Sequence, residues 1–205
     1  MNNTYIKKVE SAKEKSQTYS YQMERYKQAI HHKFYFEAIV ISYAMIEDRL
    51  LAFLHYTGVI DRRTQNNQAE RTIRVSEQAK KQISALLGYR PNYTINLNTI
   101  NIKIKIVKAL MELPEENNDL YLNLVRAQID RTIHRDEFMA LLNKLNTWLK
   151  PRNQIIHALM FKQTKDVLNR QPTIAKDGYK IGRELDGFVN KLKNRNKDGI
   201  RIPVK

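Results

Sequence analysis

The strongest constraint on the fold is a stretch of regularly spaced apolar residues in the first third of the chain. Between position 34 and Gly58, such side chains recur every three or four residues, at Phe36, Ile39, Val40, Tyr43, Ile46, Leu50 and Leu54. This is the period of an α-helix that buries one face, and glycine is a common helix stop. The pattern predicts a core helix whose apolar face must be covered by other elements.

The rest of the chain favours helices over strands. Helices are expected over 7–32 (long and mostly exposed), 72–87, 114–129 (beginning at Pro114) and 138–149. In 100–106 the isoleucines alternate as in a strand, yet Ile100, Ile104 and Val107 also share one helical face. Because its neighbours are helical, we predict a helix there, and the expected fold class is all-α.

Composition limits the partners of this chain. Its 205 residues, 42% of them hydrophobic, are enough for one core, and a formal net charge of +15 favours nucleic acid, an anionic membrane surface or acidic proteins, with nucleic acid first. Without cysteine, the chain has no disulfide or thiolate metal site. No apolar run reaches the roughly 18 residues of a membrane span, and the first residues lack the apolar core of a signal peptide. We therefore expect a soluble, cytoplasmic protein with no membrane partner.

The best candidate site is the run from Pro151 to His157, an Arg-Asn-x-x-x-His pattern. Arg25 and Arg49 also precede histidines at a similar spacing, but of the three arginines only Arg152 is followed directly by an amide residue. Apolar residues at helical spacing also lie on both sides of Arg152, namely Leu141, Leu145, Trp148, Ile155 and Leu159. Arginine binds phosphate and imidazole exchanges protons near neutral pH, so Arg152, Asn153 and His157 form a candidate RNA site.

Pro151 leaves the local geometry open. Proline removes a helical hydrogen bond, so it either kinks the helix or begins a new one, whose free N–H groups beside Arg152 would suit phosphate. On an ideal helix Asn153 and His157 share a face, whereas Arg152 lies about 140° from His157. A kink, or a second subunit across a two-fold interface, must then bring Arg152 and His157 to one phosphate.

Glu47 is a polar exception on the first core helix. It falls about 20° from Phe36, in the middle of the apolar stripe, and Arg152 falls about 40° from Trp148 on its own helix. A carboxylate at such a position needs a partner. We predict an ion pair between Glu47 and Arg152, which either serves the site or only holds the two helices together.

Further basic residues are candidates for phosphate contacts. They are Lys150 beside the motif, Arg62 and Arg63 in a polar loop, and Lys191, Lys193, Arg195 and Lys197 near the C-terminus. The segment 163–205 is expected to be a basic helical or tail extension, interrupted at Pro172, with a basic amphipathic stretch over 180–195. A merely solvated basic terminus is the alternative.

Other constellations point away from metal and cofactor chemistry. Asp130, His134 and Glu137 have a metal-compatible spacing, but Arg131 and Arg135 lie among them and would repel a cation, so an exposed ion-pair lattice is predicted instead. The chain has no Gly-rich phosphate loop and no Gly-x-Ser-x-Gly nucleophile. No metal and no cofactor are expected.

The Arg152-Asn153-x-x-x-His157 run, together with the helix from Glu37 to Glu47, resembles the HEPN superfamily. Members are helical bundles, often dimeric, and many are metal-independent endoribonucleases of toxin–antitoxin, phage-defence and RNA-guided immune systems. The resemblance covers the surroundings of these two helices only. It implies an HEPN-like bundle over 1–162 with a long N-terminal helix and a variable insertion at 62–113, followed by the basic extension 163–205.

The resemblance also implies residue roles. Arg152 and His157 would form the catalytic motif with Asn153 as its polar second position, and Glu47 would orient Arg152. His157 would act as general acid or base, Arg152 would bind the scissile phosphate, and the products would be 2′,3′-cyclic phosphate and 5′-hydroxyl ends. The implied partners are RNA, a second copy of the chain, and an antitoxin or regulatory protein. The alternative is a non-catalytic HEPN-like, or other basic helical, RNA-binding module.

Overall fold

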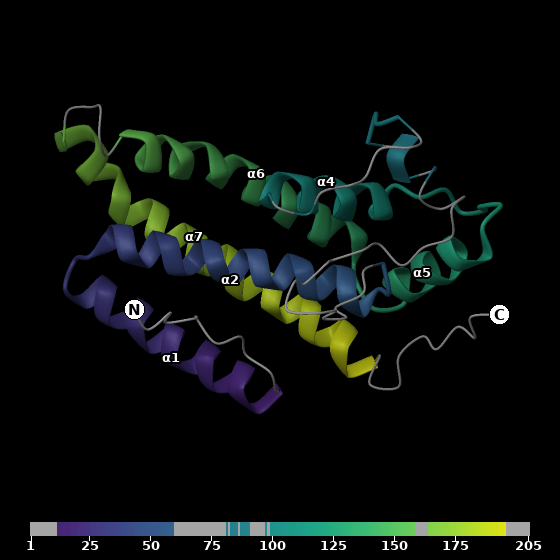
Figure 1. Ribbon diagram of the computed structural model, residues 1–205, viewed down its shortest axis with the longest axis horizontal. Helices are drawn as coiled ribbons and strands as arrows, with labels where there is room; N and C mark the ends of the chain where they lie inside the picture. The colour runs from purple at the N-terminus through teal and green to yellow at the C-terminus, as the bar shows by residue number, and fades with distance from the viewer. Residues whose placement is uncertain are drawn as a thin grey trace, which may run out of the picture.

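Helices account for nearly all the regular structure. The computed structural model describes residues 12–59, 81, 83–85, 87–90, 97, 99–158 and 164–195. The helices whose bounds lie within these residues are α1 (Ala12–His31), α2 (Tyr35–Tyr56), α4 (Ile100–Met111), α5 (Leu120–Asp130), α6 (Arg135–Ala158) and α7 (Thr164–Arg195), shown in Figure 1, and residues 81 and 83–85 are helical as well. No strand occurs among the described residues, which confirms the all-α prediction for them. None of the described helices combines the length and the apolar character needed to cross a membrane.

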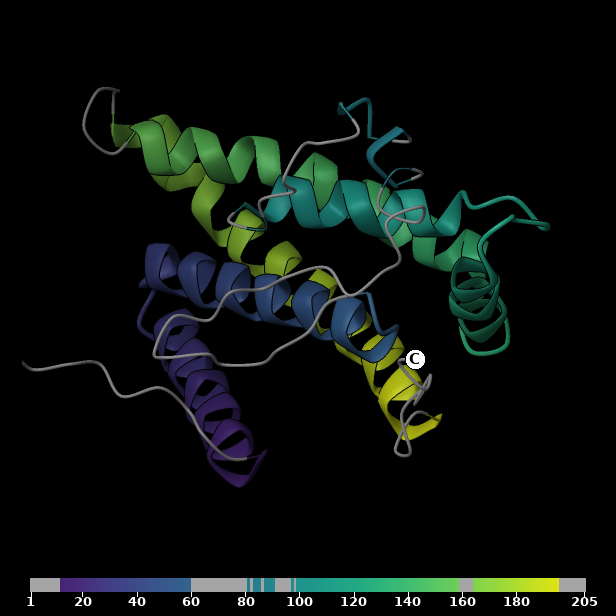
Figure 2. The same cartoon turned by 45° about the vertical axis from the view of Figure 1, so that its right-hand side comes forward.

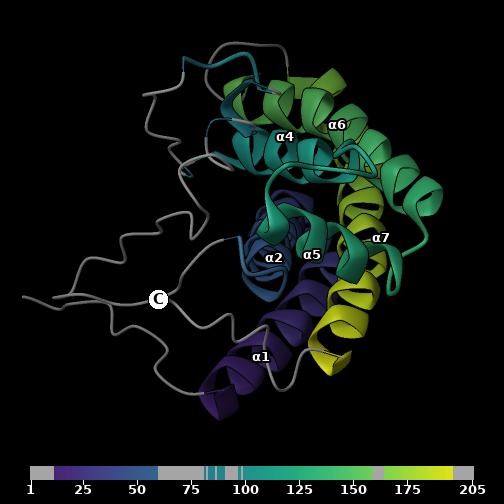
Figure 3. The same ribbon diagram turned by 90° about the vertical axis from the view of Figure 1, so that its right-hand side faces the viewer.

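The predicted core helix, α2, is the centre of the fold. It packs most extensively on α7, with α1 and α4 against its other sides, and α6 lies along α7. In Figure 3, α4 lies above α2, α7 to its right and α1 below it. The buried positions of α2 extend well around the helix, because three neighbours cover it, and they include Ala38, Ile41, Met45 and Phe53 in addition to the predicted stripe.

Two positions of the predicted stripe are not core. Phe36 and Val40 remain 37% and 42% exposed, and Tyr43 is half-buried. The reason is that α4 packs beside the C-terminal half of α2, whereas its N-terminal half extends past α4, as Figures 1 and 2 show. Periodicity identified the face but not how far along the helix that face is covered.

Helix boundaries differ from the predictions at two prolines, Pro114 and Pro172. α5 begins at Leu120 instead of Pro114, because the Asp119 carboxylate caps it by accepting from the Leu122 backbone N–H at 3.2 Å. α7 continues through Pro172, where an interruption was expected, and α6 continues through Pro151, so no new helix begins there. The prediction of a helix over 100–106 is confirmed by α4, while the one over 72–87 lies mostly outside the described residues.

The segment predicted as a basic extension belongs to the core as far as Arg195. α7 buries Ile174, Ala175, Ile181, Leu185, Val189 and Leu192, and it packs on both α2 and α6. The basic residues of this helix occupy its outer face, so a strongly charged sequence still contributes an apolar stripe.

Aromatic contacts join the three long helices. The rings of Phe53 on α2 and Phe138 on α6 stack with centroids 5.0 Å apart, and Phe188 of α7 meets Phe138 edge-on at 5.0 Å. Near the other end of α6, the Trp148 indole N–H donates to the Ile174 carbonyl at 2.8 Å. The helix that carries the candidate motif is therefore fixed against α7 just before Arg152.

Gly178 is required where α7 approaches Trp148. A Cβ at this position would lie 2.4 Å from Trp148 Cζ2 and 2.8 Å from Cε2, whereas a Cβ at Gly187 on the same helix would meet nothing within 4 Å. We expect Gly178→Ala to lower the free energy of unfolding by about 1–3 kcal/mol, because the indole has to move. Gly187→Ala should raise it by up to about 1 kcal/mol through helix propensity. Urea denaturation followed by circular dichroism compares them, and equal stabilities would contradict this packing.

Tyr26 makes stability sensitive to alkaline pH. Its ring stacks on Tyr179 with centroids 4.3 Å apart, and its hydroxyl donates to the Ala175 carbonyl at 3.3 Å. Burial, and then the neighbouring Tyr179, raise the pKa of Tyr26 from 10.0 to about 12. Because the pKa of Tyr26 is higher in the folded than in the unfolded chain, its protonated hydroxyl stabilises the fold. This contribution to the free energy of unfolding is complete below pH 10 and is lost as the pH rises towards 12. We expect the melting temperature of Tyr26→Phe to fall less steeply than that of wild type over this interval.

Candidate functional site

The candidate motif occupies the last turns of α6. The helix is continuous through Pro151, so Arg152 has no helix N-terminus beside it, and the backbone anion site that a new helix would provide is not formed. Arg152 and Asn153 are half-buried, whereas His157 is exposed. Along one continuous helix, Arg152 and His157 are about 7.5 Å apart in rise and about 140° apart in direction. The two side chains therefore leave α6 on different sides.

Arg152 reaches from α6 across to α2. Its guanidinium carbon lies 3.8 Å from the centroid of the Tyr43 ring, in cation–π geometry. Nη1 donates to Asn153 Oδ1 at 3.0 Å, while Nε is buried with no hydrogen-bond partner among the described residues. Burial lowers the pKa of Arg152, and the nearby Tyr43 and Glu47 oppose that shift. The result is a partly desolvated cation with donors to spare.

Glu47 pairs with a lysine and not with Arg152. Lys103 Nζ of α4 donates to Glu47 Oε1 at 2.6 Å. The lysine side chain is 0% exposed and the glutamate side chain 30% exposed. The predicted ion pair with Arg152 is therefore wrong, because α4 brings a buried ammonium to the carboxylate. Glu47 still acts on Arg152 through its charge, without a direct bond.

Sequence reasoning missed the two partners, Tyr43 and Lys103. Tyr43 precedes Glu47 by four residues and so shares its face of α2, but its place in the apolar stripe predicts a core residue. Lys103 lies at the edge of the apolar face formed by Ile100, Ile104 and Val107, and a lysine there needs a carboxylate. Glu47 on α2 likewise needs a cation, so the matching needs of Lys103 and Glu47 were the sequence signal that could have predicted their ion pair.

The predicted phosphate-binding residues are only partly described. Lys150 is exposed on α6, one residue before Pro151, and Lys191, Lys193 and Arg195 are exposed along the end of α7. The Arg195 guanidinium also donates to the Arg131 carbonyl, which ties the end of α7 to the turn between α5 and α6. Arg62, Arg63 and Lys197 lie outside the described residues.

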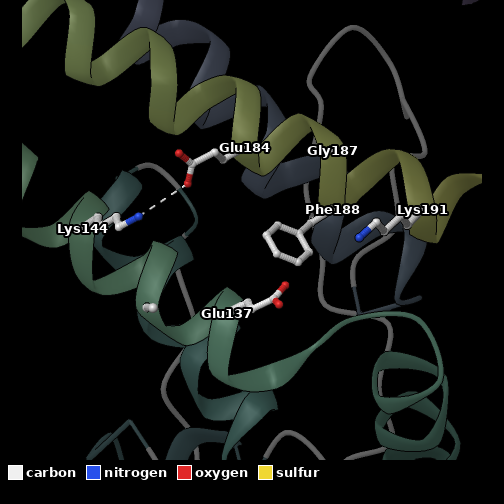
Figure 4. A pocket seen from close by; sticks show the side chains of 7 residues that line it. Glu137, Lys144, Glu184, Gly187, Phe188 and Lys191 are labelled. Atoms are coloured by element: carbon white, nitrogen blue, oxygen red, sulfur yellow. Dashed lines mark ion pairs between the residues drawn. The ribbon is translucent and has the colours of Figure 1, made fainter.

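A separate open pocket of about 450 Å³ lies between α6 and α7. Figure 4 shows Phe188 projecting between the helices, with the ion pair of Lys144 and Glu184 (3.8 Å) to its left, Lys191 to its right and Glu137 below it. Two carboxylates balance two ammonium groups, so the pocket has no marked preference for anions. It contains neither Arg152 nor His157 and is distinct from the candidate site.

The predicted ion-pair lattice around Asp130 is found in part, with Arg135 as a predicted partner and Arg126 as a further one. Asp130 Oδ1 pairs with Arg135 Nε at 2.8 Å and Oδ2 with Arg126 Nε at 3.2 Å. With both oxygens engaged by guanidinium groups, this carboxylate serves structure at the junction of α5 and α6. In the part of the chain that the structure describes, no three histidine, aspartate or glutamate side chains gather as a metal site.

Comparison of the chain with protein-family models, with curated proteins and with solved structures finds no match. Function has to be argued from the chemistry of the residues themselves.

Proposed function

We propose that this protein is a metal-independent endoribonuclease of the HEPN type, with Arg152 and His157 as its catalytic residues. The observation that carries the proposal is the state of Arg152, a half-buried guanidinium over Tyr43 with unused donors, five residues before an exposed histidine on the same helix. A desolvated cation of this kind interacts strongly with phosphate. The all-helical fold and the net charge of +15 agree with it.

The proposed reaction needs one proton removed and one supplied. As general base, the imidazole of His157 takes the proton of the ribose 2′-hydroxyl, and the 2′-oxygen attacks phosphorus. The bond from phosphorus to the 5′-oxygen breaks, and that oxygen takes a proton from solvent water and leaves as a 5′-hydroxyl. Arg152 stabilises the charge that develops on the phosphate oxygens, and Asn153 holds its guanidinium. The first product ends in a 2′,3′-cyclic phosphate.

Because Arg152 and His157 diverge by about 140° on α6, a complete site is proposed to form between two copies of the chain. Two-fold pairing along α6 brings the Arg152 of each copy towards the His157 of the other. The biological setting proposed with this activity is a toxin–antitoxin or phage-defence system, with an antitoxin or regulatory protein as a further partner.

The deciding experiment is RNA cleavage in the presence of EDTA, with product ends mapped. Wild type should release 2′,3′-cyclic phosphate ends, and Arg152→Ala should lower the rate by about 10²–10³-fold, as removal of a transition-state donor does. Lys150→Ala is the matched control, since it removes an exposed positive charge two residues away and should change only affinity. Cleavage that needs a divalent metal, or that survives Arg152→Ala, refutes the proposal.

A non-catalytic basic RNA-binding module is the second candidate. It is favoured by the exposed Lys191, Lys193 and Arg195, which concentrate positive charge at one end of α7. Such a module binds RNA with a strong dependence on salt, because each neutralised phosphate releases counterions. Neutralising these three residues would then weaken binding and flatten the salt dependence, while Arg152 and His157 variants would bind as wild type does.

A further inference from the structure

An exposed apolar face on α2 lies beside Arg152. Phe36, Val40 and Tyr43 lie within about 60° of one another around the helix, so they share one side of it. Phe36 and Val40 are 37% and 42% exposed, although both are large apolar side chains. Farther along the same side, α4 covers α2 at Glu47 through the Lys103 ion pair. Phe36 and Val40 lie in the N-terminal half of α2, whereas α4 runs beside its C-terminal half (Figures 1 and 2).

A cation borders this face at one end. The Arg152 guanidinium covers the Tyr43 ring and leaves Phe36 and Val40 as the open part. The nearby acids are occupied, since Glu47 binds Lys103 and Glu37 pairs with Arg25. The guanidinium of Arg152 is therefore the unneutralised charge beside this face. It covers Tyr43, and the Phe36 ring lies about 10 Å from Tyr43 along the axis of α2.

The combination fits single-stranded nucleic acid. Proteins that bind single strands place cations for the backbone beside aromatic side chains on which bases stack. A protein partner fits less well, because a stable protein interface buries about 800 Å² on each side, far more than these few side chains offer. Resting on the proposed function, we propose that the Phe36–Val40 face of α2 is a nucleobase-stacking subsite that holds single-stranded RNA beside Arg152.

Binding without cleavage tests the subsite. The full chain carrying His157→Ala is titrated into a fluorescent single-stranded RNA oligomer, and anisotropy gives the Kd. Phe36→Ala in this background should weaken binding by about 5- to 150-fold, the range that stacking of one base supports. Phe36→Trp should bind at least as tightly as the parent. Phe34→Ala is the matched control, because Phe34 is 61% exposed but precedes α2.

A second probe separates stacking from general affinity. An oligomer of the same length with abasic sites should bind the parent and Phe36→Ala equally weakly, since no base is there to stack. Equal Kd values for the parent and Phe36→Ala on normal RNA overturn the subsite. A change of sedimentation-measured mass in Phe36→Ala without RNA also overturns it, because the face is then a contact between copies of the chain.

The outcomes distinguish the subsite from the proposed activity. If wild type does not cleave RNA but the Kd depends on Phe36, the subsite is supported and the nuclease proposal is refuted. If wild type cleaves RNA but the Kd is the same with and without the Phe36 ring, the nuclease proposal is supported and the subsite is refuted.

Discussion

Replacing His157 by alanine is expected to lower the rate of RNA cleavage by about 10²–10⁴-fold, the usual loss when a general acid or base is removed. RNA affinity should remain within about a factor of two of wild type, because Arg152 and the basic residues that hold phosphates are untouched. The melting temperature should also be unchanged, since the imidazole is exposed at the end of α6. Single-turnover cleavage in EDTA, anisotropy and thermal unfolding measure the three quantities.

His134 provides the matched control for this prediction. It is likewise exposed, and it lies one residue before α6 begins, at the end of the helix opposite to the motif. His134→Ala should cleave as wild type does. If His157→Ala retains full activity in protein free of contaminating ribonuclease, or if both variants lose activity equally, the assignment of His157 is refuted.

Glu47→Ala is expected to lower the free energy of unfolding by about 3–5 kcal/mol, because it leaves the ammonium of Lys103 buried and unpaired. The asymmetry of the pair sharpens the prediction. Lys103 is 0% exposed, whereas 30% of the Glu47 side chain reaches solvent, so Glu47 tolerates the loss of its partner far better. Lys103→Met, which keeps most of the side-chain volume, should cost less than about 1.5 kcal/mol.

The double variant, Glu47→Ala with Lys103→Met, should recover most of the stability that Glu47→Ala loses. Urea denaturation of wild type, both single variants and the double variant gives the coupling energy. Equal losses in the two single variants would contradict a buried ammonium at Lys103. The stable double variant also isolates the effect of Glu47 on Arg152: reduced cleavage at restored stability supports an orienting role, and full cleavage leaves Glu47 with a structural one.

The covering of α2 illustrates where sequence reasoning reached its limit. The period of its apolar residues predicted the helix almost to its ends, because helical repeat and glycine stop are local properties. Whether Phe36 is core or surface depends on where α4 ends along the face, and that is set by packing among helices distant in sequence. The same holds for α7, which the sequence predicts as a basic extension with an amphipathic stretch over 180–195, whereas its packing on α2 and α6 makes it part of the core.

Local chemistry also determined that Glu47 needs a positively charged partner, since a carboxylate within an apolar stripe cannot remain unpaired. It did not determine which one, because the chain offers many cations and the choice depends on which helix comes alongside. The tertiary structure brings Lys103 to Glu47 and places Arg152 over Tyr43. By itself, then, the sequence determined the helices, their apolar faces and the order of residues in the Arg152 motif, all of which follow from interactions within a few turns of chain. The partners of its charged side chains were decided by the packing of α2, α4 and α6, because contacts across helices depend on their relative placement.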